Sequence, residues 1–257
     1  MPSPHPVPAG APCWIELFTD DRERSVRFYE ELFGWHATDP VEEYGGYWNF
    51  EHAGQPIAGG MVNDGSTGAD DAWSVYLRSD DAVKTAAAAE ANGGMVIVPP
   101  YPVMDLGSMA VVADAGGAAV GIWQVGTFAG FATTGEVGTP VWFELYTRDF
   151  DAVVDFYRDV FGWDPQRLVS DAMPDLRYAT DSAYETARAG IMDATEGLPE
   201  GAGAHWQVYI GVTDTDATVA RAQELGGTLR FGPSDSPHGR MAELADPTGV
   251  LFKVITA

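Results

Sequence analysis

The chain has 257 residues, 46% of them hydrophobic, and a formal net charge of −24 from 14 basic and 38 acidic side chains. Nucleic acids and anionic membranes bind proteins through basic surfaces, so this charge argues against both as partners. The apolar content argues against disorder, and the length is enough for two domains of ordinary size.

The N-terminal residues and the cysteine content bear on localisation. Residues 1–11 are rich in proline and predict a short extended arm rather than a secretory signal. Cys13 is the only cysteine, which excludes an intramolecular disulfide and favours a reducing, cytoplasmic location. No run approaches the roughly 18 apolar residues of a membrane span. The sequence leaves export by a non-classical route open.

The first half of the chain is repeated in the second half. Alternating residues predict a strand over 14–19, followed by a helix that ends at Gly34. The same pattern recurs as a strand over 142–147 and a helix that ends at Gly162, with half of the aligned positions identical. A repeat of about one domain length indicates two copies of one fold.

In both copies, the predicted first helix has capping residues at its start and at its end. Asp21 and Asp149 stand at the predicted helix starts, where a carboxylate caps free N–H groups and complements the helix dipole. Gly34 and Gly162 stand where a left-handed C-terminal cap is expected.

Each copy then contains a second strand-helix unit and a closing strand pair. The second unit begins at residues 73–76 and again at 206–209, and turns at Asp114 and Asp246 join the last two strands of each copy. Each copy therefore reads β-α-β-β-β twice. We expect two domains, over residues 12–125 and 140–257, joined by a Gly- and Thr-rich linker over 126–139 that should be flexible.

These motifs resemble the vicinal oxygen chelate superfamily of glyoxalases, bleomycin-resistance proteins and dioxygenases. The resemblance rests on the strand, the Asp, the helix with Phe-Tyr and the following Phe-Gly-Trp, and on Asp-Pro-Thr-Gly before the last strand. It covers nearly the whole chain and is closest to duplicated glyoxalase-like proteins of actinobacteria that carry hydroxylase or antigen labels. It implies an α+β fold of two tandem glyoxalase-like domains, each a half-open mixed-sheet barrel around a cup-shaped pocket.

The resemblance also implies positions for a metal centre, which several members hold through His, Gln or Glu. By the family's spacing, these positions are Trp14, Val75 and Gly121 in the first copy and Trp142, Val208 and Lys253 in the second. None of these side chains is an ordinary metal ligand. We therefore predict that the metal centre is absent and that no cofactor is bound, unless the register of the ligand positions is misread.

Several polar residues remain as candidates for acid-base chemistry. Glu16 and Glu144 share a strand face with Trp14 and Trp142, although a duplicated Glu is also consistent with a structural role. The second copy alone has the loop residues His238 and Arg240 with nearby Glu243, whose alternative reading is a surface loop with an ion pair. The predicted catalytic residues are Glu16, Glu144, His238, Arg240 and Glu243. The predicted ligand-binding residues are Trp14, Trp142, Val75, Val208, Tyr47, Trp48 and Tyr101.

The leading functional hypothesis is a metal-independent protein that binds a hydrophobic or aromatic small molecule. It would sequester this ligand or convert it by metal-free acid-base chemistry. The first alternative is an enzyme of bacterial specialised metabolism, such as an isomerase, cyclase, lyase or hydroxylase. A third class is an interaction protein without a pocket ligand, and we expect a monomer or homodimer.

Overall fold

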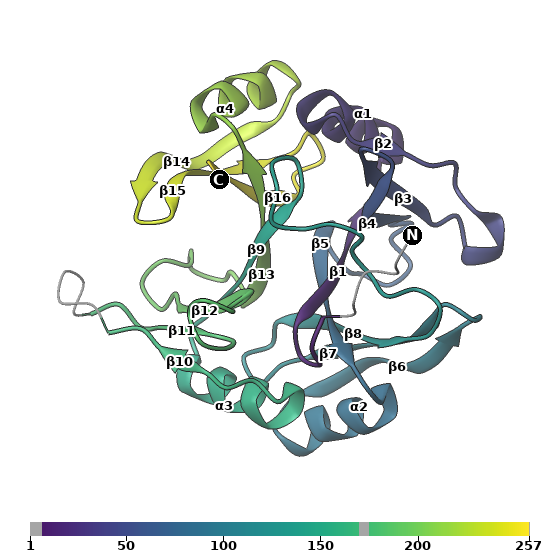
Figure 1. The fold of residues 1–257 in the computed structure, drawn as a ribbon, viewed down its shortest axis with the longest axis vertical. Helices are drawn as coiled ribbons and strands as arrows, with labels where there is room; N and C mark the ends of the chain where they lie inside the picture. Colours follow the sequence, from purple (N-terminus) through teal and green to yellow (C-terminus); the bar gives the residue numbers. More distant parts are fainter. Residues whose placement is uncertain (1–6, 170–174, 257) are drawn as a thin grey trace. The chain divides into compact units, whose positions relative to one another are not determined.

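The computed structural model describes residues 7–169 and 175–256. It contains two mixed sheets of eight strands, one from each copy, which confirms the predicted α+β class and the tandem arrangement (Figure 1). The strand order is β2-β3-β4-β1-β5-β8-β7-β6 in the first sheet and β10-β11-β12-β9-β13-β16-β15-β14 in the second.

The strands of the first copy are β1 (Pro12–Thr19), β2 (His36–Ala37), β3 (Trp48–His52), β4 (Gln55–Val62), β5 (Ala72–Ser79), β6 (Met95–Val103), β7 (Gly107–Ala113) and β8 (Ala119–Val125). Those of the second are β9 (Pro140–Thr147), β10 (Gln166–Arg167), β11 (Tyr178–Thr180), β12 (Ala189–Asp193), β13 (His205–Val212), β14 (Thr228–Ser236), β15 (Gly239–Ala245) and β16 (Leu251–Thr256). The helices are α1 (Arg22–Phe33), α2 (Ala82–Ala91), α3 (Phe150–Phe161) and α4 (Thr215–Glu224), with a short 3₁₀ turn, η1 (Glu42–Tyr44).

The predicted helix ends are confirmed, with one difference between the copies. Gly34 and Gly162 follow α1 and α3 with φ angles of 69° and 71°, in the left-handed region that glycine adopts without strain. The Asp21 carboxylate accepts a hydrogen bond from the Arg24 N–H at 3.0 Å. Asp149 makes no such side-chain cap on α3, so its contribution there is limited to the helix dipole.

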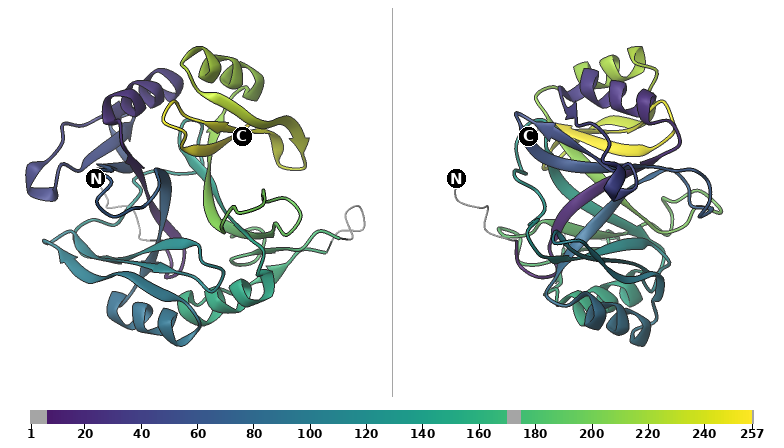
Figure 2. Two further views of the ribbon diagram at one scale, coloured as in Figure 1. Left: turned by 180° about the vertical axis from the view of Figure 1, so that it is seen from behind. Right: turned by 90° about the vertical axis from the view of Figure 1, so that its right-hand side faces the viewer.

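The chain divides into two compact units that do not coincide with the two copies. Unit one combines Val75–Gly130 and Phe143–Trp206 with the described part of Met1–Cys13. Unit two combines Trp14–Ser74, Phe131–Trp142 and Gln207–Ala257. Each unit thus joins one strand-helix module from each copy. Helices α2 and α3 pack together in unit one, and α1 and α4 pack together in unit two (Figure 1, Figure 2).

The core of unit one is held by a buried polar chain across the two copies. The Trp206 indole N–H donates to the Tyr157 hydroxyl at 3.1 Å, and that hydroxyl lies 3.1 Å from the Asp114 carboxylate. Asp114 also accepts hydrogen bonds from the Gly116 and Ala118 N–H groups in the predicted turn. Burial raises the pKa of Asp114 to about 6, although these hydrogen bonds lower it.

Unit two repeats this arrangement with the copies exchanged. The Trp73 indole N–H donates to the Tyr29 hydroxyl at 2.9 Å, and the Tyr29 ring packs against Phe252 with centroids 5.7 Å apart. Burial raises the pKa of Tyr29, and the charge of Asp246 raises it further. The duplicated Phe-Tyr and Asp-turn motifs therefore serve the same purpose in both units: they attach one copy to the other.

The segment between the copies forms hydrogen bonds near both of its ends. Its first residues bond within unit one, where the Phe128 N–H donates to the Leu106 carbonyl at 3.1 Å. Its last residues bond within unit two, where the Trp35 indole N–H donates to the Gly138 carbonyl at 2.7 Å. These hydrogen bonds satisfy backbone carbonyl and N–H groups of the Gly-rich segment.

Candidate functional site

Strand β1 presents two distinct faces in unit two. Thr19 shares a face with Ile15 and Leu17, and its hydroxyl lies 2.9 Å from that of Ser25 on α1. Because side chains alternate along a strand, Glu16 points to the opposite face. We call this opposite face of the sheets, away from the helices, the helix-free face.

Trp14, Tyr47 and Glu16 form a hydrogen-bonded group on the helix-free face of unit two. The Trp14 indole N–H donates to the Tyr47 hydroxyl at 2.8 Å, and the Tyr47 hydroxyl is hydrogen-bonded to Glu16. Burial raises the pKa of Tyr47 well above its ordinary value, and the Glu16 charge raises it further. Tyr47 therefore keeps its proton at neutral pH and donates it to the carboxylate.

Gly59 makes room for this group. It lies opposite Glu16 in the parallel pairing of β1 with β4, and a Cβ atom at Gly59 would lie 1.8 Å from the Tyr47 hydroxyl oxygen. Gly190 is the corresponding residue opposite Glu144, and a Cβ there would lie 2.0 Å from the Tyr178 hydroxyl. In both copies, a tyrosine hydroxyl therefore lies over the glycine that pairs with the glutamate of the copy's first strand, Glu16 in β1 or Glu144 in β9.

In the second copy, Glu144 is hydrogen-bonded to a tyrosine at a different position in the fold. Glu144 is buried in unit one, and the Tyr146 hydroxyl donates a hydrogen bond to its carboxylate. The Tyr146 ring stacks on His205 with centroids 5.7 Å apart, which places an imidazole next to this pair. Phe18 occupies the position of Tyr146 in the first copy, so this contact belongs to the second copy alone.

A second polar group lies on the helix-free face of strands β13, β15 and β16. We call it the Lys253 row, and its members are Gln207, Tyr209, Glu243 and Lys253. Lys253 faces Tyr209 in the parallel pairing and Glu243 in the antiparallel one. Its Nζ donates to the Tyr209 hydroxyl at 3.1 Å and lies 3.9 Å from Glu243 Oε2, which also accepts from Gln207 Nε2 at 3.1 Å.

The three candidate residues at the β14–β15 turn do not gather into one site. Arg240 is on the α4 side of β15, where its guanidinium binds Asp216 at 2.6 and 3.0 Å and Asp235 at 3.0 Å. His238 is exposed in the turn. Glu243 points to the other face and joins the Lys253 row, because an odd residue separation reverses the direction of a strand side chain. Arg240 is therefore a surface ion-pairing residue with Asp rather than Glu partners.

The predicted ligand-binding residues also lie on different faces. Val75 shares a strand face with Ser79, whose hydroxyl is 2.9 Å from that of Thr85 on α2. Val208 directly precedes Tyr209, which lies on the helix-free face, so Val208 points to the opposite face. Both valines therefore belong to the helix-covered core. Trp48 is fully buried, with the Arg22 guanidinium of α1 4.9 Å from its ring centroid. These three residues do not share the face of Glu16.

Tyr101 and Trp142 are more accessible. Tyr101, on β6, is 46% exposed, and its hydroxyl donates to the Met109 sulfur at 2.9 Å. Its partner in the strand pairing is Met109, which places Tyr101 in register with the helix-free face of unit one. Trp142, on β9, is partly exposed.

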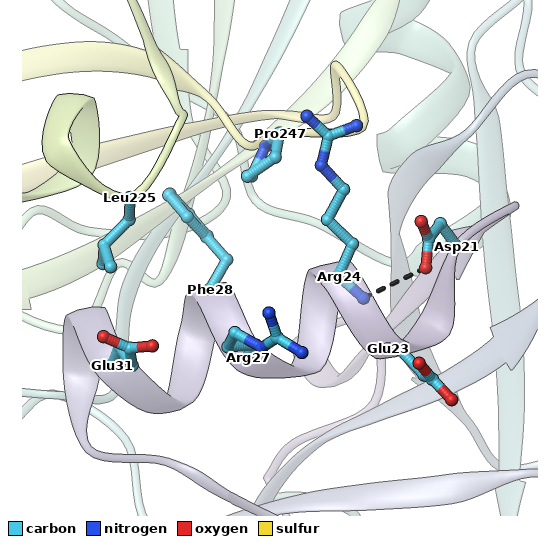
Figure 3. A pocket seen from close by; sticks show the side chains of 8 residues that line it. All are labelled: Asp21, Glu23, Arg24, Arg27, Phe28, Glu31, Leu225 and Pro247. Atoms are coloured by element: carbon cyan, nitrogen blue, oxygen red, sulfur yellow. Dashed lines mark hydrogen bonds between the residues drawn. The ribbon is translucent and has the colours of Figure 1, made fainter.

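A groove of about 390 Å³ lies on the helical side of unit two, beside α1 (Figure 3). Its lining is mostly charged, and Arg24, Arg27, Glu31 and Phe28 contribute to it together with Pro247. None of the predicted site residues lines this groove. It is therefore separate from the chemistry of the helix-free faces.

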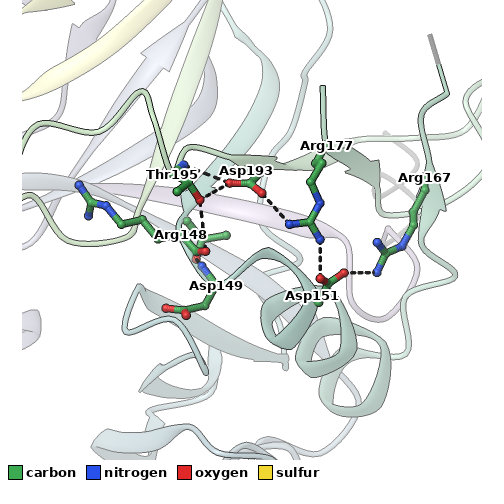
Figure 4. Close-up of polar contacts among 8 residues, drawn as sticks. Arg148, Asp149, Asp151, Arg167, Arg177, Asp193 and Thr195 are labelled. Carbon is green, nitrogen blue, oxygen red and sulfur yellow. Dashed lines mark hydrogen bonds and ion pairs between the residues drawn. The ribbon is translucent and has the colours of Figure 1, made fainter. Parts of the chain in front are cut away.

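Ion pairs also tie α3 to its neighbouring strands in unit one (Figure 4). Asp151 binds both Arg167, at 2.8 Å, and Arg177, and Arg177 also binds Asp193 at 2.8 Å. Exposed pairs of this kind contribute little to stability, because solvent screens them. They stabilise the outer surface of this unit and add no group to the helix-free face.

The residues at the family's metal positions do not fit a metal ion. In the first copy, Gly121 offers no side chain, and a Cβ there would lie 2.2 Å from the ring of Tyr76. In the second copy, Lys253 brings an ammonium group, which donates hydrogen bonds and repels a cation. Within residues 7–169 and 175–256, no three His, Cys, Asp or Glu side chains gather in a group that could hold a metal.

The comparison with protein families identifies the fold independently. The Glyoxalase/Bleomycin resistance protein/Dioxygenase superfamily matches residues 13–122 and 139–254, one match to each copy. The chain belongs to this superfamily, as its sequence motifs predicted.

Two relatives of similar length are also similar in sequence over nearly the whole chain. The anthracycline biosynthesis protein DnrV of Streptomyces peucetius is 38% identical over 264 residues, covering 96% of this chain and 93% of the relative. CFP32 of Mycobacterium tuberculosis, named as a glyoxylase, is 34% identical over 263 residues, covering 99% of this chain and 98% of the relative.

Solved structures with low sequence identity share the fold. A Mn(II)-bound glyoxalase from Novosphingobium aromaticivorans aligns with a TM-score of 0.64 at 14% identity, covering 96% of this chain and 82% of that one. The 2,3-dioxygenase LapB from Pseudomonas sp. KL28 aligns with a TM-score of 0.65 at 14% identity, covering 98% and 94%. At this level of identity the likeness establishes the fold alone.

No described helix is long and apolar enough to cross a membrane.

Proposed function

We propose that the protein binds a flat aromatic small molecule on its helix-free faces and does so without a metal ion. The observation that carries this proposal is the Trp14–Tyr47–Glu16 group, which places an indole, a phenol and a carboxylate side by side. Aromatic surface with a few fixed polar groups is the usual composition of a small-molecule site. The relatives named for anthracycline biosynthesis support a polycyclic aromatic ligand.

The same residues also suit acid-base conversion of such a ligand. Glu16 and Glu144 are carboxylates held by tyrosine hydroxyls, so each is positioned to accept a proton from an acidic C–H or O–H of a bound molecule. The second proposal is accordingly an enzyme of specialised metabolism. Sequestration and conversion share one binding step and differ in whether these carboxylates exchange protons with the ligand.

Binding can be tested with a neutral aromatic probe, anthraquinone-2-carboxamide. We expect it to quench the protein's tryptophan fluorescence saturably, and we expect Trp14→Ala to weaken its binding. Trp163→Phe is the control, because the Trp163 ring packs against Tyr157 of α3 in the helix-covered core of unit one, with ring centroids 4.8 Å apart. No saturable binding by the wild-type protein would refute the proposal.

Conversion can be separated from sequestration with two conservative variants. Polycyclic aromatic polyketides are incubated with the wild type, Glu16→Gln and Glu144→Gln, and products are followed by mass spectrometry. Product from the wild type that disappears in a variant with unchanged probe binding supports an enzyme. Probe binding without product from any of the polyketides supports sequestration.

A further inference from the structure

The groove beside α1, which we call the α1 groove, has the size of a ligand site. It lies within unit two, and its volume of about 390 Å³ is in the range of small-molecule sites. Residues of α1 form one side of it, and Leu225 at the end of α4 and Pro247 in the β15–β16 turn form the other (Figure 3). Arg24 and Arg27, one helical turn apart on α1, both line it.

These two arginines differ from most cations of the chain. The sequence has 38 acidic and only 14 basic side chains, so a carboxylate partner is easy to find. Arg221, for example, binds Glu31 at 2.7 Å. Among the residues that the structure describes, however, the guanidinium groups of Arg24, Arg27 and Arg230 have no hydrogen-bond or ion-pair partner. Two of them line the same groove.

Most carboxylates of the α1 groove are committed to other contacts. Glu31 is held by Arg221, and the Asp21 carboxylate accepts a hydrogen bond from the Arg24 backbone N–H at 3.0 Å. Glu23 has no such contact within the described residues, and it lies in the first turn of α1, where a carboxylate complements the helix dipole. After these contacts, two cations remain in the groove against one carboxylate.

The α1 groove also offers apolar surface beside its charges. Leu225 and Pro247 are partly exposed on the side opposite the arginines. Phe28 lies beneath them, buried, with its ring 6.0 Å from that of Phe252 between centroids. A molecule with an apolar part next to a negative charge would therefore find a partner for both parts.

The equivalent helix of unit one lacks these cations. Helices α3 and α2 pack together there as α1 and α4 do in unit two. In the aligned sequences of the two copies, Ala152 and Asp155 of α3 stand at the positions of Arg24 and Arg27. The helix pair thus forms without the two arginines, and they are a feature of unit two only.

We infer that the α1 groove is a second ligand site, which binds a small molecule with a carboxylate or phosphoryl group on an apolar ring or chain. The planar guanidinium of arginine matches both of these oxyanions through paired N–H donors. Leu225 and Pro247 pack against the apolar part. Because the net charge is −24, the surface as a whole repels anions, and their binding depends on local charge such as that of Arg24 and Arg27.

The test uses three naphthalene probes: 2-naphthoate, 2-naphthyl phosphate and the neutral 2-naphthamide. Their affinities are measured by ligand-observed NMR with saturating anthraquinone-2-carboxamide, which keeps the proposed aromatic site on the helix-free faces occupied. We expect at least one anionic probe to bind the wild type saturably and more tightly than 2-naphthamide does. Arg24→Gln and Arg27→Gln should each weaken the binding of that anion about threefold to tenfold.

Arg230→Gln is the matched control. It also removes a guanidinium without a partner in the described residues, but from the exposed surface of β14, outside the α1 groove. It should leave the affinity of the anionic probe within about twofold. Because Arg24 and Arg27 are exposed as well, their replacement leaves the core of unit two intact.

The two anions distinguish the chemical source of the charge. Tighter binding of 2-naphthyl phosphate identifies a phosphoryl ligand, tighter binding of 2-naphthoate identifies a carboxylate, and equal binding identifies a site for both. If the wild type binds neither anion, or if both arginine variants bind it as the wild type does, the site is refuted. Equal weakening of 2-naphthamide in these variants would also overturn the inference, because the groove would then not recognise charge.

Discussion

The buried Asp114 carboxyl should make the stability of the protein depend on pH in a specific way. It joins the last strands of the first copy to Tyr157 of the second, inside unit one. Its pKa is raised from 3.8 to about 6, mainly by burial. Between these values the folded protein binds a proton that the unfolded chain releases, so this carboxyl stabilises the fold as the pH falls from about 6 to about 4.

The size of the effect follows from the two pKa values. A difference of this size corresponds to about 3 kcal/mol of unfolding free energy, absent at pH 7 and fully present below about pH 4. Asp114→Asn removes the titrating group and keeps an oxygen that can accept from the Gly116 and Ala118 N–H groups. We therefore expect the pH profile of the variant to lack this rise.

Urea unfolding at a series of pH values measures the difference. The quantity of interest is the unfolding free energy of the wild type minus that of Asp114→Asn, because subtraction cancels the other carboxyls. Asp80→Asn also removes one carboxyl, and its side chain is 72% exposed, so it is the matched control for a surface carboxyl. Parallel profiles for the wild type and Asp114→Asn between about pH 4 and pH 7 would refute the argument.

Three further predictions concern the helix-free face, the surface and the single cysteine. Gly59→Ala should displace the Tyr47 hydroxyl, because the new Cβ would be 1.8 Å from it. Binding of anthraquinone-2-carboxamide should therefore fall, while the far-ultraviolet circular dichroism of the protein stays the same. Unaltered binding would contradict this prediction. Arg240→Ala should leave the urea midpoint nearly unchanged and leave probe binding intact, because solvent screens its exposed pair with Asp216. A loss of probe binding would show that Arg240 contributes to the site. Cys13 should resist iodoacetamide until urea unfolds the protein, because burial raises the pKa of its thiol and only the thiolate reacts; rapid labelling of the native protein would be inconsistent with its placement.

The sequence predicts the repeated elements well because local chemistry decides them. Gly34 and Gly162 end their helices as left-handed caps, and Asp114 forms the turn that its spacing indicated. These features depend on residues within a few positions of one another. A motif that occurs twice in register is also sufficient to identify the superfamily.

The exchange of modules between the copies could not be predicted from the sequence. Tyr29 contacts Phe252 of the other copy, and Tyr157 contacts Asp114 of the other copy. Because both copies carry the same motifs, pairing within a copy and pairing between copies satisfy the pattern equally. Only the three-dimensional arrangement distinguishes them.

The placement of the candidate residues on the strand faces could be predicted only in part, for a related reason. Strand alternation places Glu16 on the helix-free face, but a one-residue difference in register moves Val75 and Val208 into the core. The Lys253 row joins Gln207, which is far along the chain from Lys253, so its neighbours are invisible in the sequence. The sequence gives one indication of this row, which is the charged Lys253 within the largely apolar strand β16.

The central claim is that the helix-free faces bind an aromatic ligand without a metal. The most direct measurement is the affinity for anthraquinone-2-carboxamide before and after dialysis against a chelator, with metal content determined by mass spectrometry. The proposed site predicts the same dissociation constant in both samples and no stoichiometric transition metal. Affinity that falls on chelation and returns with added Mn(II), Fe(II), Ni(II) or Zn(II) would contradict it.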